Sequence, residues 1–140
     1  ERIHNTLKKY PYLVAEQGGE PVGYAYVGPF HDRPAYDWAV ETSIYVDQNK
    51  KRMGIGKKLH EALEEELRNR GFLNMNACIA YPAQEDEYLT RNSVEFHAHL
   101  GYRMVGQFHQ CGYKFHRWYD MVWMEKLIGE HTADQQLPQF

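Results

Sequence analysis

The chain has 140 residues, 43% of them hydrophobic and 25% charged, which suits one globular domain with a buried core. Its formal net charge of −3 argues against a nucleic-acid surface as the main feature. No apolar run approaches the roughly 20 residues of a membrane span, and no secretory leader is expected. Cys78 and Cys111 lack the spacing of a metal site or a disulfide scaffold and are expected to be buried free thiols. A cytoplasmic protein with no nucleic-acid or membrane partner is the prediction.

The first 37 residues predict a short helical end and a β-hairpin. Ile3 and Leu7 recur at helical spacing, which indicates the end of a helix over 1–9. Strands are expected at 12–15 and 21–30, with a Gly18-Gly19 turn between them. A loop rich in Asp, Arg and Pro follows.

The next segment predicts a strand at 38–46 and the longest helix of the chain. The strand alternates, with one face formed by Val40, Thr42, Ile44 and Val46 and the other by Glu41, Ser43 and Tyr45. The helix is expected to run from about Gly54 to Arg70 and to end at Gly71. Its apolar stripe is Ile55, Leu59, Ala62, Leu63 and Leu67, and its outward side is Glu61, Glu64, Glu65 and Arg68.

The remaining segments complete an α/β pattern. We expect a strand at 72–80, a helix at 93–100 that ends at Gly101, and two aromatic strands at 102–113 and 118–127. Strands that alternate with helices before a closing hairpin predict a mixed sheet flanked by helices. The domain is expected to span 1–128, and the polar tail at 129–140 is expected to be frayed.

The turn before the long helix carries a candidate phosphate site. Glycines at 54 and 56 let the backbone approach a bulky anion, and the helix start offers unpaired N–H groups and a favourable dipole. Basic residues surround this turn, namely Lys50, Lys51, Arg52, Lys57 and Lys58. Neither a Walker loop nor GxGxxG is present. A glycine turn that merely starts a helix is the alternative.

The order of strand, basic turn, glycine loop and long helix resembles the acetyl-CoA signature of the GNAT superfamily. That signature begins with Gln or Arg, where this chain has Lys51. Three further runs resemble the phosphinothricin acetyltransferase branch: VETSIYV at 40–46, SVEFHAHLGY at 93–102, and the closing hairpin with GYK at 112–114 and WYD at 118–120. The resemblance implies a GNAT fold, with a mixed and mostly antiparallel twisted sheet. The family also begins with a strand and a helix that this chain is expected to lack.

The resemblance implies the cofactor contacts. The strand residues Ile44, Tyr45 and Val46 are expected to line the acetyl and pantetheine arm, with a backbone N–H near Val46 as oxyanion donor. The loop residues assigned to acetyl-CoA are Lys51, Arg52, Met53, Gly54, Ile55, Gly56 and Lys57. Asn92 matches an Asn that contacts CoA in the branch, although its place three residues before Glu95 also fits a helix cap.

Glu41 is the candidate general base, directly or through a water. The alternative is a structural ion pair with Arg33 or Lys114. His97 matches a branch histidine that is a candidate for the proton relay, whereas a buried histidine bonded to backbone is the alternative. His116 does not align with the second branch histidine.

The remaining candidates concern the acceptor and partners. Arg33 and Lys114 suit a carboxylate, and Tyr36 and Tyr113 suit a pocket wall. We expect an N-acetyltransferase for a small amino-acid-like amine of the phosphinothricin or methionine sulfoximine type, without a metal and as a homodimer. Two alternatives stay open: an acetyltransferase for a peptide, protein or polyamine amine, and a non-catalytic acetyl-CoA-binding module.

Overall fold

The computed structural model describes residues 2–5, 10–47, 54–82, 84–85 and 91–140. The chain forms two compact units. Unit 1 combines residues 1–75 with 127–140, and unit 2 comprises residues 76–126. Within the described residues, neither helix is both long and apolar enough to cross a membrane.

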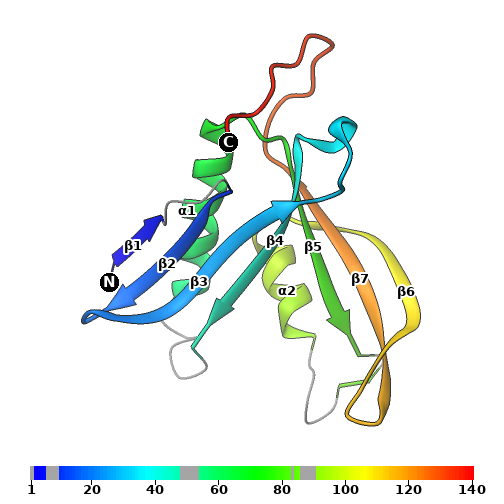
Figure 1. Ribbon diagram of the computed structural model, residues 1–140. Coiled ribbons are helices and arrows are strands. Elements are labelled where there is room, and N and C mark those ends of the chain that lie inside the picture. The colour runs from blue at the N-terminus through cyan, green and yellow to red at the C-terminus, as the bar shows by residue number, and fades with distance from the viewer. Residues whose placement is uncertain (1, 6–9, 48–53, 83, 86–90) are drawn as a thin grey trace. The chain divides into compact units, whose positions relative to one another are not determined.

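Unit 1 is built on four antiparallel strands in the order β1-β2-β3-β4 (Figure 1). Their bounds are β1 Arg2–Asn5, β2 Tyr12–Gln17, β3 Glu20–Pro29 and β4 Ala39–Val46, with a 3₁₀ turn at Pro34–Tyr36. The prediction of a helix at 1–9 is wrong for residues 2–5, because these residues form β1 and pair with β2. Two apolar residues are too few to fix a helical period, and a short helix is marginal without packing. Residues 6–9 lie outside the described part.

The two faces of this sheet differ, as the alternation of β4 predicts. On one face, residues of β3 pair with the apolar set of β4: Gly23 with Val46, Ala25 with Ile44, and Val27 with Thr42. Helix α1 covers this face. A Cβ added at Gly23 would meet the Tyr45 carbonyl oxygen at 2.9 Å and Leu59 Cδ1 at 3.1 Å. Gly23 therefore permits the close approach of β3, β4 and α1.

Helix α1 spans Ile55–Asn69 and confirms the long amphipathic helix. The core side of the stripe is at most 1% exposed and consists of Ile55, Leu59, Leu63 and Leu67. Ala62 is half-buried. The prediction that Glu64 faces outward is wrong, because its side chain is only 13% exposed and contacts both His60 and Arg68. The helix ends before Gly71, whose φ of +91° is a conformation that favours glycine.

The C-terminal segment packs against residues of 1–75 within unit 1, so the expectation of a frayed tail is wrong. The Gln139 N–H donates to the Arg70 carbonyl at 2.8 Å, and Trp38 Nε1 donates to the Gln136 carbonyl at 2.7 Å. The Phe140 ring lies edge-on to Tyr10 and Phe72. Ordered tails of this kind need tertiary partners that are distant in sequence, and a local polar pattern does not reveal them.

Unit 2 holds most of strand β5 (Asn74–Tyr81), helix α2 (Asn92–His99) and the strands β6 (Arg103–Lys114) and β7 (Arg117–Leu127). The strand order is β5-β7-β6, and β6 and β7 form an antiparallel hairpin. Strand β6 is exposed along nearly its whole length. Cys111 on β6 is exposed and Cys78 is half-buried, so the prediction of two buried thiols is wrong. Both cysteines are free.

Candidate functional site

The start of helix α1 has the geometry of an anion cradle. Gly54 is the N-cap residue and has φ +72° and ψ +14°, in the left-handed region. Among described atoms, a Cβ added there would meet nothing within 4 Å, so backbone conformation alone requires glycine. The Lys58 N–H donates to the Gly54 carbonyl at 3.1 Å. The N–H groups of Ile55, Gly56 and Lys57 precede that bond and have no carbonyl within the helix to bind.

This cradle suits a pyrophosphate. The helix dipole favours negative charge at its N-terminus, and the first N–H groups point toward it. Lys57 and Lys58 are exposed in the first turn, and the Lys57 ammonium lies 4.0 Å from the Glu61 carboxylate, with both side chains largely exposed. Gly56 is buried in the first turn of α1. The predicted contacts Lys51, Arg52 and Met53 lie outside the described residues.

The end of β4 has two backbone N–H groups that do not face β3. The Phe30 N–H donates to the Ala39 carbonyl at 3.3 Å, and the Asp47 N–H donates to the Val22 carbonyl at 2.8 Å. Because bonding alternates along an antiparallel pair of unbroken register, the odd-numbered residues of β4 bond to β3. The N–H groups of Ile44 and Val46 therefore point away from β3. This arrangement fits the predicted oxyanion donor near Val46.

Glu41 lies on β4, half-buried, on the face opposite α1. It pairs directly with Gly28 of β3 and shares its face with Ser43 and Tyr45. Among the described residues, no carboxylate–guanidinium contact within 4.0 Å joins Glu41 to Arg33, so the structural ion pair with Arg33 is not formed. Glu41 therefore lies on a partly open face of the sheet, where its carboxylate can act as a proton acceptor.

A ladder of four tyrosines lies on the same face, and the sequence analysis missed it. The ladder consists of Tyr12, Tyr24, Tyr26 and Tyr45. In the five ring pairs other than Tyr12 with Tyr45, the centroids are 5.1 to 6.4 Å apart and the ring planes lie within 33° of each other. The pKa of the Tyr45 hydroxyl is raised above its usual value. Partial burial is the main cause, and the neighbouring Tyr26 with its hydrogen bond adds to it. The sequence signal is the alternation of Tyr24 and Tyr26 along β3, and the β3–β4 register adds Tyr45 opposite Tyr24.

His97 on α2 is buried and bonded to backbone. Its Nδ1 lies 2.7 Å from the Ser93 carbonyl and donates to it, which leaves Nε2 as the acceptor. Burial lowers the pKa of this imidazole, only partly opposed by the Ser93 bond. The backbone-bonded alternative is thereby confirmed, and the relay role stays a prediction. The capping interpretation of Asn92 is wrong, because the N-cap is Arg91 and Asn92 is the first helical residue.

The four predicted acceptor residues fall in two places. In unit 1, Arg33 precedes the 3₁₀ turn, and the Tyr36 ring packs on His31 at 5.1 Å. In unit 2, Tyr113 and Lys114 end β6, where the Tyr113 ring contacts Trp118 at 4.9 Å. Lys114 Nζ lies 5.9 Å from the Tyr119 ring centre. All four residues are exposed.

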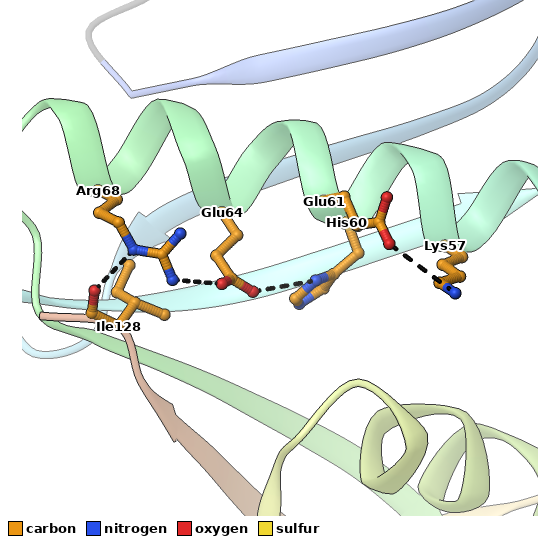
Figure 2. A network of polar contacts seen from close by, with 6 residues as sticks. All are labelled: Lys57, His60, Glu61, Glu64, Arg68 and Ile128. Carbon is orange, nitrogen blue, oxygen red and sulfur yellow. Dashed lines mark hydrogen bonds and ion pairs between the residues drawn. The ribbon is translucent and has the colours of Figure 1, made fainter.

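A polar network along α1 was also missed, and it is structural (Figure 2). His60 is 2% exposed, and its Nδ1 lies 3.8 Å from Glu64 Oε1. Arg68 donates from Nη2 to Glu64 and from Nε to the Ile128 carbonyl at 2.9 Å. The network joins α1 to the C-terminal segment and so holds the helix whose N-terminus forms the cradle. The described part of the chain contains no group of three or more His, Cys, Asp and Glu side chains able to hold a metal.

Comparisons with known proteins identify the family of the chain. The model of the acetyltransferase (GNAT) domain matches residues 1–123. A phosphinothricin N-acetyltransferase from Streptomyces viridochromogenes is 36% identical over 97% of the chain and 67% of its own length. An L-methionine sulfoximine/L-methionine sulfone acetyltransferase from Salmonella typhimurium is 35% identical over 91% of the chain and 70% of its own.

A solved structure gives the same result for the fold. The phosphinothricin acetyltransferase from Sinorhizobium meliloti, in complex with AcCoA, superposes with a TM-score of 0.78. It is 35% identical, and the match covers 93% of this chain and 66% of that one. The predicted GNAT fold is confirmed.

Proposed function

The chain belongs to the GNAT acetyltransferase family, and from that premise we propose that it acetylates the amine of a small amino-acid-like acceptor. The observation that carries the proposal is the left-handed Gly54 at the start of α1, which is the next described element after the strand that bears Glu41. The relatives named for phosphinothricin and methionine sulfoximine acetylation favour this class of acceptor.

The residues at the start of α1 fit the co-substrate. Acetyl-CoA, when bound, supplies an activated acetyl thioester. The N–H groups of Ile55, Gly56 and Lys57 would hold its pyrophosphate, with Lys57 adding positive charge. The backbone of Ile44, Tyr45 and Val46 would line its arm, and the Val46 N–H would donate where negative charge develops on oxygen. Asn92 is proposed as a further contact.

Glu41 is proposed to take the proton of the acceptor amine. An ammonium carries no lone pair, so attack requires a neutral nitrogen. The Glu41 carboxylate stands on a partly open face and has no ion pair with Arg33, which leaves its oxygens available to a donor. His97 is proposed to assist proton transfer through Nε2, because Nδ1 is committed to Ser93. Arg33 and Lys114 are proposed to bind the acceptor carboxylate, with Tyr36 and Tyr113 beside it.

The test is thiol release from acetyl-CoA, followed with a disulfide dye. Acceptors would be phosphinothricin, methionine sulfoximine, free amino acids, polyamines and short peptides, and the variant Glu41→Gln would be measured beside wild type. We expect turnover with an amino-acid-like acceptor and a loss of 10²-fold or more in kcat for Glu41→Gln. Acetyl-CoA affinity should stay within twofold. Tight CoA binding without turnover on any acceptor would contradict the proposal and favour a binding module.

We further propose a homodimer that forms through the β6–β7 hairpin. Its large exposed side chains support this, namely Phe108, Tyr113, Phe115 and Trp118, each at least half exposed. Light scattering of wild type and Trp118→Arg gives the test, and a wild type that is monomeric at micromolar concentration would contradict it. A cytoplasmic location is also proposed, since the exposed free thiol of Cys111 suits a reducing compartment.

A further inference from the structure

Gly28 in β3 has no structural reason to be glycine. Its φ lies outside the left-handed region, so the backbone conformation is open to any residue. Among described atoms, a Cβ added at Gly28 would meet nothing within 4 Å. Glycine inside a strand also weakens it, because the unfolded chain has more freedom to lose. Neither conformation nor packing therefore accounts for Gly28.

Gly23, five residues earlier in the same strand, is the contrasting case. Its added Cβ would meet the Tyr45 carbonyl oxygen at 2.9 Å, which is closer than real Cβ contacts come. Packing against β4 and α1 thus explains Gly23 fully. At Gly28 the situation is the opposite, because no described atom is near. A glycine there leaves space open that a ligand could occupy.

The open space lies beside Glu41. Gly28 and Glu41 are directly opposed in the β3–β4 register, and such pairs project to the same side of the sheet. A Cβ at position 28 would stand roughly 5 Å from the Glu41 Cβ, next to the carboxylate. The next side chain of β3 on this face is Tyr26, which lies opposite Ser43 and stacks in the tyrosine ladder.

We propose that the opening over Gly28 admits the α-carbon and the first side-chain atoms of the acceptor, and that Tyr26 bounds it. Gly28 is thus a specificity-determining residue that sets how bulky an acceptor can be at the carbon bearing the amine. The amine that reaches Glu41 carries its substituents within two bonds, so they must occupy the space next to the carboxylate. This inference rests on the proposed role of Glu41.

The experiment compares Gly28→Ala and Gly28→Val with wild type, using the full chain. Gly106→Ala in β6 is the matched control, because an added Cβ there also meets no described atom within 4 Å. Acceptors would be alanine, methionine sulfoximine and phosphinothricin. Three quantities are measured: kcat and KM for each acceptor, the Kd for acetyl-CoA, and the calorimetric Kd of each acceptor for the CoA complex.

For Gly28→Val we expect a tenfold or greater rise in KM and in acceptor Kd, and a smaller rise for Gly28→Ala. The loss should be greatest for the two larger acceptors. Acetyl-CoA Kd should stay within twofold, and the melting temperature should be unchanged or higher. Gly106→Ala should match wild type.

Two results would overturn the inference. One is acceptor Kd and KM within twofold of wild type in both Gly28 variants, and the other is a parallel loss of acetyl-CoA affinity. The acceptor Kd also separates this inference from the proposed function. If wild type binds acceptors but does not turn them over, the proposed role of Glu41 is wrong. The role of Gly28 can then still be tested by comparing the acceptor Kd of Gly28→Val with that of wild type. Wild type that binds no amino acid defeats both.

Discussion

Helix α1 and the β6–β7 hairpin are held in place by different forces. The helix buries a continuous apolar stripe against the sheet of unit 1, and its charged residues bond along its own length. The hairpin leaves β6 exposed, and where its register shifts it depends on a buried carboxylate, Asp120. Because apolar burial holds the helix in place, the N–H groups at the start of α1 are not needed for packing and can bind a ligand. In the hairpin, by contrast, Gln107 and Gln110 bond to Asp120 and fix the shape of the strands themselves.

The largest effect should come from removing part of the apolar stripe. Leu63 is 1% exposed at the centre of α1. Leu63→Ala loses transfer free energy and leaves a cavity, so we expect the free energy of unfolding to fall by about 3 kcal/mol. Urea denaturation measures this change. A loss below about 1 kcal/mol would mean that burial is not what holds the helix. Val105→Ala, at an exposed position of β6, is the control and should change little.

The anchor of the hairpin is the next test. Asp120 accepts from the Gln110 N–H at 2.8 Å and from Gln107 Nε2 at 2.7 Å. Gln110 has φ +48°, so these bonds stabilise a strained residue at the register shift. Asp120→Asn removes the charge, and we expect a loss of about 1.5 kcal/mol at pH 7, measured by urea denaturation.

The pH dependence of that loss has a definite sign. The Gln110 bond, followed by the Gln107 bond, lowers the pKa of Asp120 below its ordinary 3.8. Its contribution is therefore full above the unfolded-state pKa and is lost as the pH falls through the folded-state pKa. The difference in the free energy of unfolding between wild type and Asp120→Asn should be constant from pH 7 to pH 5. It should shrink below about pH 3.8. A gap that persists at pH 2.5 would refute the anchor role.

Gly54→Ala should cost about 1 kcal/mol, because a left-handed φ disfavours a residue with a Cβ. The added Cβ has no described neighbour within 4 Å, so no clash adds to this cost. Thermal unfolding measures the cost, and the Kd for acetyl-CoA shows whether the cradle shifts with it. Gly54→Asn should cost less, since Asn tolerates this conformation better. Equal stability of all three proteins would contradict the conformational argument.

The smallest effect concerns His97. Burial lowers its pKa below 6.5, so the unfolded state binds a proton more readily. Stability from this group is thus full above pH 6.5 and declines as the pH falls below that value. His97→Asn keeps a donor for the Ser93 carbonyl but does not titrate. Its melting temperature should fall less than that of wild type between pH 7.5 and 5.5.

The sequence predicts this fold well where one local pattern decides the structure. The helical period of α1 predicts its buried apolar stripe, and the alternation of β4 predicts its two faces. The structure shows both. It fails where a partner lies far along the chain. Glu64 was expected in solvent, but it contacts Arg68, and Arg68 in turn bonds to the Ile128 carbonyl sixty residues away. The order of the tail likewise depends on bonds to Arg70 and Trp38.

The candidate site divides in the same way. Gly54 and Glu41 follow from local sequence, because a glycine turn and an alternating strand place them. The tyrosine ladder and the opening at Gly28 require the register between β3 and β4, which no single segment contains. Cross-strand register is fixed by the whole sheet, so residues of this kind emerge only from the folded chain.

Unit 1 is discontinuous along the polypeptide, since 127–140 joins 1–75 after the whole of unit 2. Its contact order is accordingly high, and the loop that must close includes all of 76–126. During translation the strands of unit 1 leave the ribosome long before the residues that complete their packing. Folding of unit 1, including the start of α1, is therefore expected to finish only after residues 127–140 have been synthesised, and the nascent chain to depend on chaperones until then.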